Sequence, residues 1–355
     1  MAFLFKRNPK TPSELVRMMN EQVTKLDTAQ DKKKVQDEVS RYLLQIREIL
    51  LGDDEGDIHP DQIAQLAQEV YSTDCLYLLV YHLSRLEFDS RKHVVTLFSI
   101  LLRREVGNRS PTVDHLLARP RTLTCLFSGP ETPETAPITG SILRECIKYD
   151  SIARFCLKDP IIWDYFGYCQ TGTFENATDA FDTLRDLLTV HKKCADEFFR
   201  ENLERFTQEF NSLMSSKNYV TKRQSIKLLS QLLLQKENQF FMTSYVNSPH
   251  NLKLVMILLG DKSKNIQYES FHAFKVFVAN PKKTKPVSDI LIKNRDKLLV
   301  FLKEFDSGKK EDRSYVNEKE FVIGKIEELP RLLSSSTDLT NYEDAEGNNA
   351  SINKT

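Results

Sequence analysis

The feature that most constrains the fold is an apolar pattern that recurs about every 45 residues. In each copy, large apolar residues stand at positions i, i+3, i+6 and i+7, which places them on one face of a helix. Copies about 38 to 49 residues apart are typical of armadillo and HEAT repeats. The copies are Ile226, Leu229, Leu232 and Leu233; Phe271, Phe274, Phe277 and Val278; Phe181, Leu184, Leu187 and Leu188; Val94, Leu97, Ile100 and Leu101; and a weaker one near Leu143 and Cys146.

Further segments show the same one-sided helical periodicity, and the alternation typical of strands is absent. Residues typical of a helix N-terminus occur at Thr11-Pro12-Ser13-Glu14 and at Ser288-Asp289. Each helix pair leaves an apolar face that only a neighbouring pair can cover. The sequence therefore predicts an all-α, armadillo/HEAT-like helical-repeat solenoid shaped as a curved rod. The further predicted helices are Ser13–Leu26, Val35–Leu50, Pro60–Val70, Cys75–Leu86, Phe198–Met214, Leu252–Leu259, Val287–Phe305 and Glu318–Leu332.

The repeat domain is expected to span residues 1–333, because the composition changes after it. Residues 334–355, "SSSTDLTNYEDAEGNNASINKT", are polar with almost no apolar periodicity. Such a segment buries too little apolar area to offset the entropy of ordering, so we predict a disordered tail. Within the domain, "GDDEGD" at Gly52–Asp57 and "SGPETPETAP" at Ser128–Pro137 are predicted to be loops.

Membrane insertion and export are not expected from this sequence. No run of 18 apolar residues occurs, and the start "MAFLFKRNPK" has its charges after a short apolar stretch, the reverse of a signal peptide. The 6 cysteines include no CxxC pair, which indicates reduced, mostly buried thiols. We therefore expect a cytoplasmic protein.

The sequence lacks the common motifs for catalysis and metal binding. An EF-hand loop beginning at Asp53 would need Gly at its sixth position and Glu at its twelfth. Gly56 comes two positions too early, and Ala64 stands in place of the Glu. The patterns GxxxxGK[ST], GxGxxG, HExxH and GxSxG are also missing. The sequence thus predicts no enzyme, no cofactor and no metal site.

Charge is unevenly placed although the net charge is zero. Residues 217–300 contain 15 Lys or Arg against 5 Asp or Glu, which indicates an acidic partner for this block. An RNA- or phosphate-binding solenoid is one alternative, with Tyr268, Lys282, Lys283 and Lys285 as its exposed groups. However, the nearby phenylalanines belong to the apolar pattern, and no base-reading residue recurs from repeat to repeat.

One helix within this block, "NYVTKRQSIKLLSQLLLQ" at residues 218–235, carries a local basic cluster. Arg223 and Lys227 are i,i+4 neighbours beside the apolar stripe, and they do not recur in the other copies. The next helix, "NLKLVMILLG", offers Lys253 and the adaptable apolar Met256. A short acidic, aromatic peptide would suit this combination, but an ordinary solvated helix face explains the spacing better.

Several long motifs resemble one known family. They are "NYVTKRQSIKLL", "NLKLVMILLGDKSKNIQYESFHAFKVFVANPKKTKP", "LLRREVGNRSPTVDHL" and "TFENATDAFDTLRDLLTVHK". The chain resembles the mouse-protein-25 family, also called calcium-binding protein 39, from about Phe3 to Leu333. Its opening "MAFLF" is most similar to the fungal branch, which is linked with hypha and conidiophore morphogenesis.

The resemblance implies a non-catalytic armadillo-like scaffold. Such proteins bind Sterile-20-type (germinal-centre) kinases or pseudokinases and hold the kinase domain in its closed, active form. The implied setting is cell polarity and morphogenesis signalling, with enrichment at sites of polarised growth or division. The implied partners are proteins rather than nucleic acids or membranes, and the scaffold is expected to be a monomer before binding.

Two sets of site residues follow from the resemblance. The family's pocket for a C-terminal Trp-Glu-Phe tail corresponds here to Arg223, Lys227, Lys253 and Met256, and both motifs that supply them are intact.

The family's concave kinase-docking surface corresponds to Phe174, Tyr219, Lys236 and Lys293. Lys236 departs from the vertebrate pattern, because "QKEN" stands where those relatives have "DRHN". Lysine lacks the planar, two-pronged donor geometry of arginine, so the resemblance does not carry the family's kinase contact over intact at this position.

Overall fold

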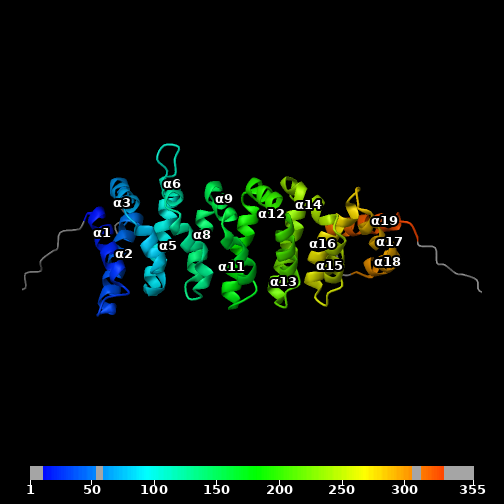
Figure 1. The fold of residues 1–355 in the computed structure, drawn as a ribbon, viewed down its shortest axis with the longest axis horizontal. Coiled ribbons are helices and arrows are strands. Elements are labelled where there is room, and N and C mark those ends of the chain that lie inside the picture. The colour runs from blue at the N-terminus through cyan, green and yellow to red at the C-terminus, as the bar shows by residue number, and fades with distance from the viewer. Residues whose placement is uncertain (1–10, 53–58, 306–312, 332–355) are drawn as a thin grey trace, which may run out of the picture.

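A rod of stacked helices is the main feature of the computed structural model, which describes residues 11–52, 59–305 and 313–331. Within these ranges the chain forms α-helices and short 3-10 turns, and the only β-type pairing is one isolated bridge between Val106 and Arg109. Figure 1 shows the helices side by side in one row, with α1 (Pro12–Lys25) and α19 (Arg313–Glu327) at opposite ends. The predicted all-α helical-repeat fold is confirmed.

The remaining elements follow one another along this row. They are α2 (Lys32–Leu51), α3 (Pro60–Ser72), α4 (Cys75–Tyr81), η1 (Leu83–Arg85), α5 (Phe88–Arg103), α6 (Pro111–Ala118), α7 (Arg121–Phe127), η2 (Gly129–Glu131), α8 (Ala136–Cys146), α9 (Asp150–Lys158), η3 (Pro160–Trp163), α10 (Asp164–Tyr168), α11 (Phe174–Thr189), α12 (Lys192–Met214), α13 (Tyr219–Leu234), η4 (Lys236–Asn238), α14 (Gln239–Val246), α15 (Pro249–Leu259), α16 (Lys264–Ala279), α17 (Lys285–Lys293) and α18 (Arg295–Glu304).

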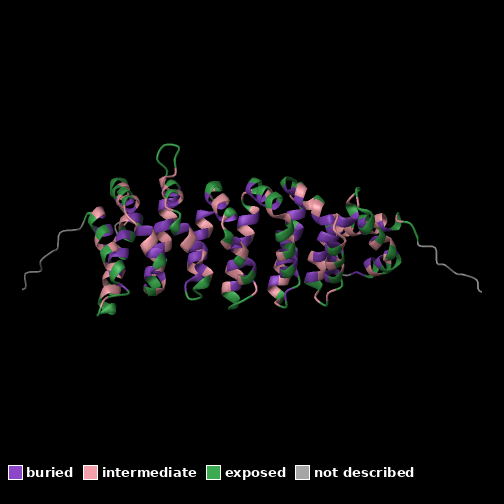
Figure 2. Ribbon diagram, in the orientation of Figure 1, coloured by how far each residue is buried: buried purple, intermediate pink, exposed green. Residues whose placement is uncertain are grey.

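The recurrent apolar pattern builds one continuous ladder of helices. Its copies lie on α5, α8, α11, α13 and α16, and each of these helices packs against the next. Every residue of the pattern is buried except Ile100, which is half-buried. Figure 2 shows the buried positions gathered where neighbouring helices meet. Since burying one large apolar side chain contributes about 1.5–3 kcal/mol, each helix depends on its neighbours for several such contributions.

One predicted helix is wrong in its length and its start. The segment Val287–Phe305 forms two helices, α17 and α18, because Asn294 leaves the helical conformation at φ −104° and ψ 5°. The buried Arg295 then donates hydrogen bonds to the carbonyls of Glu327 and Leu329 at the end of α19. These long-range bonds hold the bend. The start signal at Ser288-Asp289 is also wrong, since α17 begins at Lys285.

Other helix ends match the prediction more closely. Thr11 forms the expected capping box with Glu14 at the start of α1. The segment Cys75–Leu86 contains a shorter helix followed by a 3-10 turn. Helix α8 begins inside the predicted loop Ser128–Pro137, because proline is tolerated in the first turn of a helix. The final helix, predicted over Glu318–Leu332, begins and ends earlier than expected.

A kink in α12 shapes the region that contains the candidate site. The backbone at Asn202 is non-helical (φ −128°, ψ 21°), and its side-chain amide donates a hydrogen bond to the Phe198 carbonyl at 3.1 Å. Side-chain atoms thus replace part of the regular backbone ladder, which is a known cause of helix bending. As a result, the second half of α12 runs in a different direction from the first half.

Two sequence predictions lie outside the described residues. They are the disordered tail at 334–355 and all of the acidic loop Gly52–Asp57 except Gly52. In the parts of the chain that are described, no helix is both long enough and apolar enough to cross a bilayer.

Candidate functional site

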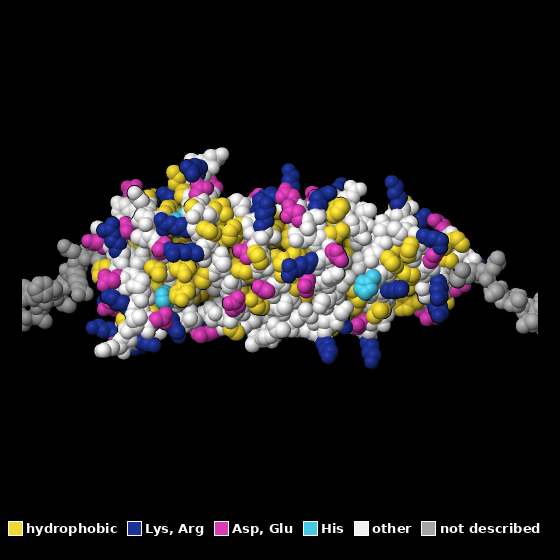
Figure 3. All heavy atoms as spheres, viewed as in Figure 1, with side chains coloured by type: hydrophobic (Ala, Val, Ile, Leu, Met, Phe, Trp, Pro, Cys, Tyr) yellow, Lys and Arg dark blue, Asp and Glu magenta, His cyan; other side chains and the backbone are white. Residues whose placement is uncertain are grey.

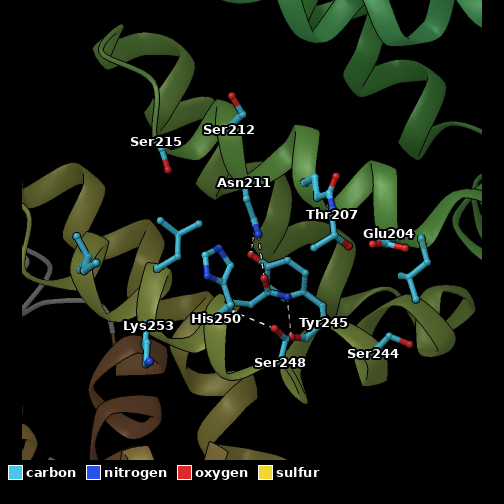
Figure 4. A pocket seen from close by; sticks show the side chains of 15 residues that line it. Glu204, Thr207, Asn211, Ser212, Ser215, Ser244, Tyr245, Ser248, His250 and Lys253 are labelled. Atoms are coloured by element: carbon cyan, nitrogen blue, oxygen red, sulfur yellow. Dashed lines mark hydrogen bonds between the residues drawn. The ribbon is translucent and has the colours of Figure 1, made fainter.

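A cavity of about 740 Å³ lies between α12, α14 and α15 (Figure 4). Its volume falls within the range of ligand-binding clefts. Leu203, Leu254 and Ile257 supply apolar wall, and Ile257 is 70% exposed although it is a large apolar residue. An exposed isoleucine beside a cavity of this size indicates a surface that a partner could cover.

The floor of the cavity is a buried polar network. Asn211 on α12 donates a hydrogen bond from Nδ2 to Oδ1 of Asn251 at 2.9 Å. The Tyr245 hydroxyl donates to Oδ1 of Asn211 at 2.9 Å, and Nδ2 of Asn251 donates to the Tyr245 carbonyl at 3.1 Å. Figure 4 shows Asn211 and Tyr245 pointing toward each other between the helices. Because each amide oxygen has two lone pairs, the network retains acceptor capacity for a ligand.

Charged side chains stand at the rim. Lys253 is exposed and makes no ion pair with any described residue, whereas Glu204 lies across the cavity on α12 (Figure 4). His250 stands on the same helix as Lys253. The rim thus offers one uncompensated cation to an acidic group that enters from the side of α15.

The four residues predicted for the tail pocket do not all line this cavity. Lys253 does, whereas Met256, three residues further along α15, is half-buried and packs against the core. Arg223 and Lys227 are both exposed on α13 and are not part of the lining. Their joint role in one pocket therefore stays a prediction.

The basic cluster on α13 divides into two kinds of residue. Lys222 forms an ion pair with Asp261, with Nζ 3.6 Å from Oδ2. Arg223 and Lys227 make no ion pair with any residue that the structure describes. Asn218 caps the helix by accepting a hydrogen bond from the Val220 amide at 2.9 Å. The two exposed cations thus remain available to a partner.

The predicted kinase-docking residues mark the starts or ends of separate elements. Phe174 and Tyr219 are the first residues of α11 and α13, and they are 62% and 45% exposed. A shallow depression joins Phe174 to the first turns of α13, where Thr221 and Gln224 form its far wall. Two of the predicted docking elements are therefore adjacent.

The other two docking residues, Lys236 and Lys293, are both exposed. Lys236 opens η4, and Lys293 ends α17. They are separate from the depression beside Phe174, whose lining does not include them. A kinase domain would have to span these elements to contact all four positions.

Hydrogen bonding gives Tyr219 a distinct environment. Its hydroxyl lies 3.3 Å from the Ser263 hydroxyl and accepts a hydrogen bond from Nδ2 of Asn265 at 3.4 Å. These hydrogen bonds, with help from the nearby charge of Arg223, lower the pKa of Tyr219 below its usual value. The ring is thereby held at the junction of α13 and α16.

Sequence patterns did not reveal the cavity itself. Asn211 and Asn251 are buried polar residues within otherwise apolar helix faces, and this was the one available signal. Nothing in the sequence shows that they meet across two helices that are about 40 residues apart. Among the described residues, no group of three or more His, Cys, Asp or Glu side chains is placed to hold a metal ion.

The row of stacked helices and its exposed groove define a helical-repeat solenoid of the armadillo type. An engineered protein solved by the Northeast Structural Genomics Consortium has a similar fold, with a TM-score of 0.51 over 90% of this chain and 72% of its own. At 12% sequence identity, this similarity concerns the fold alone.

Comparison with known sequences then identifies the family. The Mo25-like family model matches residues 3–330, so the chain belongs to the Mo25-like family. The human calcium-binding protein 39-like is 42% identical over 92% of this chain and 98% of its own length. Protein HYM1 of Saccharomyces cerevisiae is 40% identical, covering 99% of this chain and 92% of its own. The conidiophore development protein hymA of Emericella nidulans is 38% identical, with 93% and 94% covered.

These matches confirm the family that the sequence motifs predicted. Membership of the Mo25-like family fits a non-catalytic scaffold role, which requires protein partners. The names of the fungal relatives associate one of them with development of the conidiophore.

Proposed function

We propose that this protein is a scaffold that binds and allosterically activates a Sterile-20/germinal-centre-type kinase or pseudokinase. Its concave surface would contact the kinase domain, and the cavity beside Lys253 would take the partner's C-terminal tail. The observation that carries the proposal is that cavity, which combines apolar walls with an uncompensated cation. An acidic, aromatic tail has matching chemistry.

The energetics require two contact surfaces. Burying about 300 Å² of apolar area from two aromatic rings contributes roughly 7 kcal/mol. One charge-assisted hydrogen bond adds about 1.5–3 kcal/mol, whereas association costs about 4–15 kcal/mol. A short tail alone should therefore bind weakly. Firm binding needs the second surface, which acts at the high effective concentration created by the first.

A binding assay with single and double variants tests the two surfaces. Phe174→Ala on the docking surface and Lys253→Ala at the cavity should each weaken binding of a germinal-centre kinase, and the double variant should nearly abolish it. Phe88→Ala is the matched control, because Phe88 also begins a helix and is 67% exposed. Wild-type affinity in the double variant would contradict the two-surface proposal.

Activation would be a shift of the kinase between conformations. A scaffold can bias the kinase towards its closed form only by binding that form more tightly than the open one. We therefore expect kinase turnover to rise when the scaffold is added, with no phosphotransfer by the scaffold itself. Phosphotransfer by the isolated protein would contradict a non-catalytic role.

Nucleic-acid binding by the basic block is less well supported. Several of its cations are neutralised within the protein, as in the pairs Lys222–Asp261 and Lys285–Asp289. Tyr268, which would have to stack on a base, is half-buried against the core. On the face shown in Figure 3, basic and acidic side chains are interspersed. Binding to RNA that falls steeply with salt would revive this alternative.

The proposed setting is cytoplasmic, with enrichment at sites of polarised growth or division. We further propose that the repeat domain spans residues 1–333 and that the polar segment 334–355 lies outside it. A fluorescent fusion imaged in growing cells would test the proposed localisation. Uniform fluorescence throughout polarised growth would contradict the enrichment.

A further inference from the structure

We propose that the protein's own segment 339–344, "LTNYED", docks in the cavity between α12 and α15 and competes there with the partner's tail. The scaffold would then be self-inhibited until a partner displaces this segment. The proposal rests on the proposed function, because it assigns a regulator to the same cavity. Its occupant is a named part of this chain rather than an unidentified protein.

The segment has the chemistry that the cavity favours. Tyr342 is an aromatic residue followed directly by the carboxylates of Glu343 and Asp344. The ring can bury its face against apolar wall, while a carboxylate pairs with the free ammonium group of Lys253. Leu339 adds a second apolar side chain three residues before the tyrosine.

The floor of the cavity supplies a partner for the tyrosine hydroxyl. Oδ1 of Asn251 accepts a hydrogen bond from Asn211 and has a second lone pair. A phenol that entered above the floor could donate to that lone pair. A phenylalanine in its place would leave the lone pair unused, so the cavity can distinguish tyrosine from phenylalanine.

The described chain ends within reach of the cavity. Helix α19 ends at Glu327, and the chain is described as far as Arg331. Tyr342 is 11 positions beyond Arg331 in the sequence, and an extended stretch of that length spans about 36 Å. In the stack, α19 packs on α16, which packs on α15, so one helix layer separates the end of the rod from the cavity wall.

Hydrogen bonds follow part of this path. Burial lowers the pKa of Lys283, and repulsion by the nearby Lys325 on α19 lowers it further. The Lys283 ammonium donates to the Asn280 carbonyl at 2.7 Å, and Nδ2 of Asn280 donates to Oδ1 of Asn247 at 3.1 Å. Asn247 immediately precedes Ser248, which lines the cavity. Hydrogen bonds therefore connect Lys283, which lies near α19, to the residues beside the rim.

A second cavity closer to the end of the rod is a poorer site for this segment. It has a volume of about 290 Å³ and lies between α18 and α19. Its Lys319 already donates hydrogen bonds to the carbonyls of Phe305 and Lys303. Glu320 would repel the carboxylates of the segment, and the third charged lining residue, Lys303, already pairs with Glu327 at 3.4 Å. The cavity beside Lys253 is therefore the better match.

Site-specific photo-crosslinking in the full chain tests the docking directly. A photoreactive phenylalanine analogue replaces Thr340, so that Tyr342 keeps its hydroxyl, and crosslinked peptides are mapped by mass spectrometry over a range of protein concentrations. We expect concentration-independent crosslinks to α12 and α15, and their loss in Ser212→Trp, which fills the cavity entrance from an exposed position. The analogue placed at Ser351 is the control. Crosslinks that map to α18 or α19, or that are absent, would overturn the proposal.

A competition assay tests the regulatory consequence. The probe is a fluorescent peptide ending in Trp-Glu-Phe, titrated into the wild-type full chain and the variant Tyr342→Ala/Glu343→Ala. With an effective concentration near 1 mM for the tethered segment, we expect the variant to bind the probe about two- to tenfold more tightly. Equal affinity would overturn self-inhibition.

The two assays separate this proposal from the proposed function. If the probe binds but the crosslinks fail to map to α12 and α15, self-inhibition is wrong and the partner-tail pocket stands. If the crosslinks map there but no kinase tail or probe binds the variant, the segment docks as proposed and the proposed function is wrong.

Discussion

Replacing Gly140 with alanine should destabilise the protein by displacing a buried ion pair. Gly140 lies on α8 and faces α11, where an added Cβ would stand 2.8 Å from Cγ of Asp179 and closer still to its Oδ2. Asp179 cannot move away freely, because Nη2 of Arg144 holds its Oδ1 at 2.6 Å. The two side chains are only 11% and 23% exposed, so a displaced partner would leave a largely buried charge.

The expected change in the free energy of unfolding is the difference between two effects. Alanine in place of glycine inside a helix stabilises by about 0.5–1 kcal/mol. Loss of the charge-assisted hydrogen bond between Arg144 and Asp179 costs about 1.5–3 kcal/mol. We therefore expect Gly140→Ala to lower the free energy of unfolding by about 1–2 kcal/mol.

Urea unfolding followed by circular dichroism measures this difference. Gly167→Ala is the matched control, because an added Cβ there meets no atom within 4 Å and should stabilise by about 0.5–1 kcal/mol. In an Asp179→Ala background, Gly140→Ala should no longer be destabilising, which a double-mutant cycle would reveal. If Gly140→Ala stabilised the protein as much as Gly167→Ala does, the steric argument would be refuted.

Two further predictions concern protonation. Burial lowers the pKa of His82, His93 and His115, so the unfolded chain binds more protons as the pH falls through about 6.5. The stability that these residues contribute is complete above that pH and is lost below it. The protection factors of α4 to α6, which correct for the slower intrinsic hydrogen exchange in acid, should therefore fall between about pH 7.5 and pH 5.5. Unchanged protection factors would contradict this. Burial also raises the pKa of Cys75 to about 12, whereas Cys125 is only half-buried. In the native protein, Cys125 should therefore react with a thiol reagent more than about tenfold faster than Cys75. Equal rates for the two thiols would contradict the burial of Cys75.

The architecture was predictable because the signal for it is local and repeated. Each copy of the pattern, such as Ile226 to Leu233, specifies a helix and its buried face without information from elsewhere in the chain. The break between α17 and α18 was not predictable, since the buried Arg295 that holds it contacts backbone carbonyls more than 30 residues away. A periodic apolar pattern continues through such a bend and gives no sign of it.

The site was predictable only in part, for a similar reason. The long motifs pointed to Phe174, Tyr219 and Arg223, and the structure leaves all three exposed in the first turns of α11 and α13. The cavity depends on three elements, α12, α14 and α15, and on the direction that α12 takes after Asn202. Directions of helices after a kink are set by tertiary contacts, which spacing along the sequence does not encode.

The repeats explain why a local site can arise in this part of the rod. Residues of the recurrent pattern hold each helix in the ladder, so positions outside the pattern can change without unstacking the neighbours. Every α12 residue that lines the cavity, from Leu203 to Ser212, follows the kink at Asn202. The kink therefore separates a half of α12 that packs like an ordinary repeat from a half that borders a groove. Straightening it by Asn202→Leu would extend the regular ladder, and we expect binding of an acidic, aromatic peptide to fall while the helical content is retained.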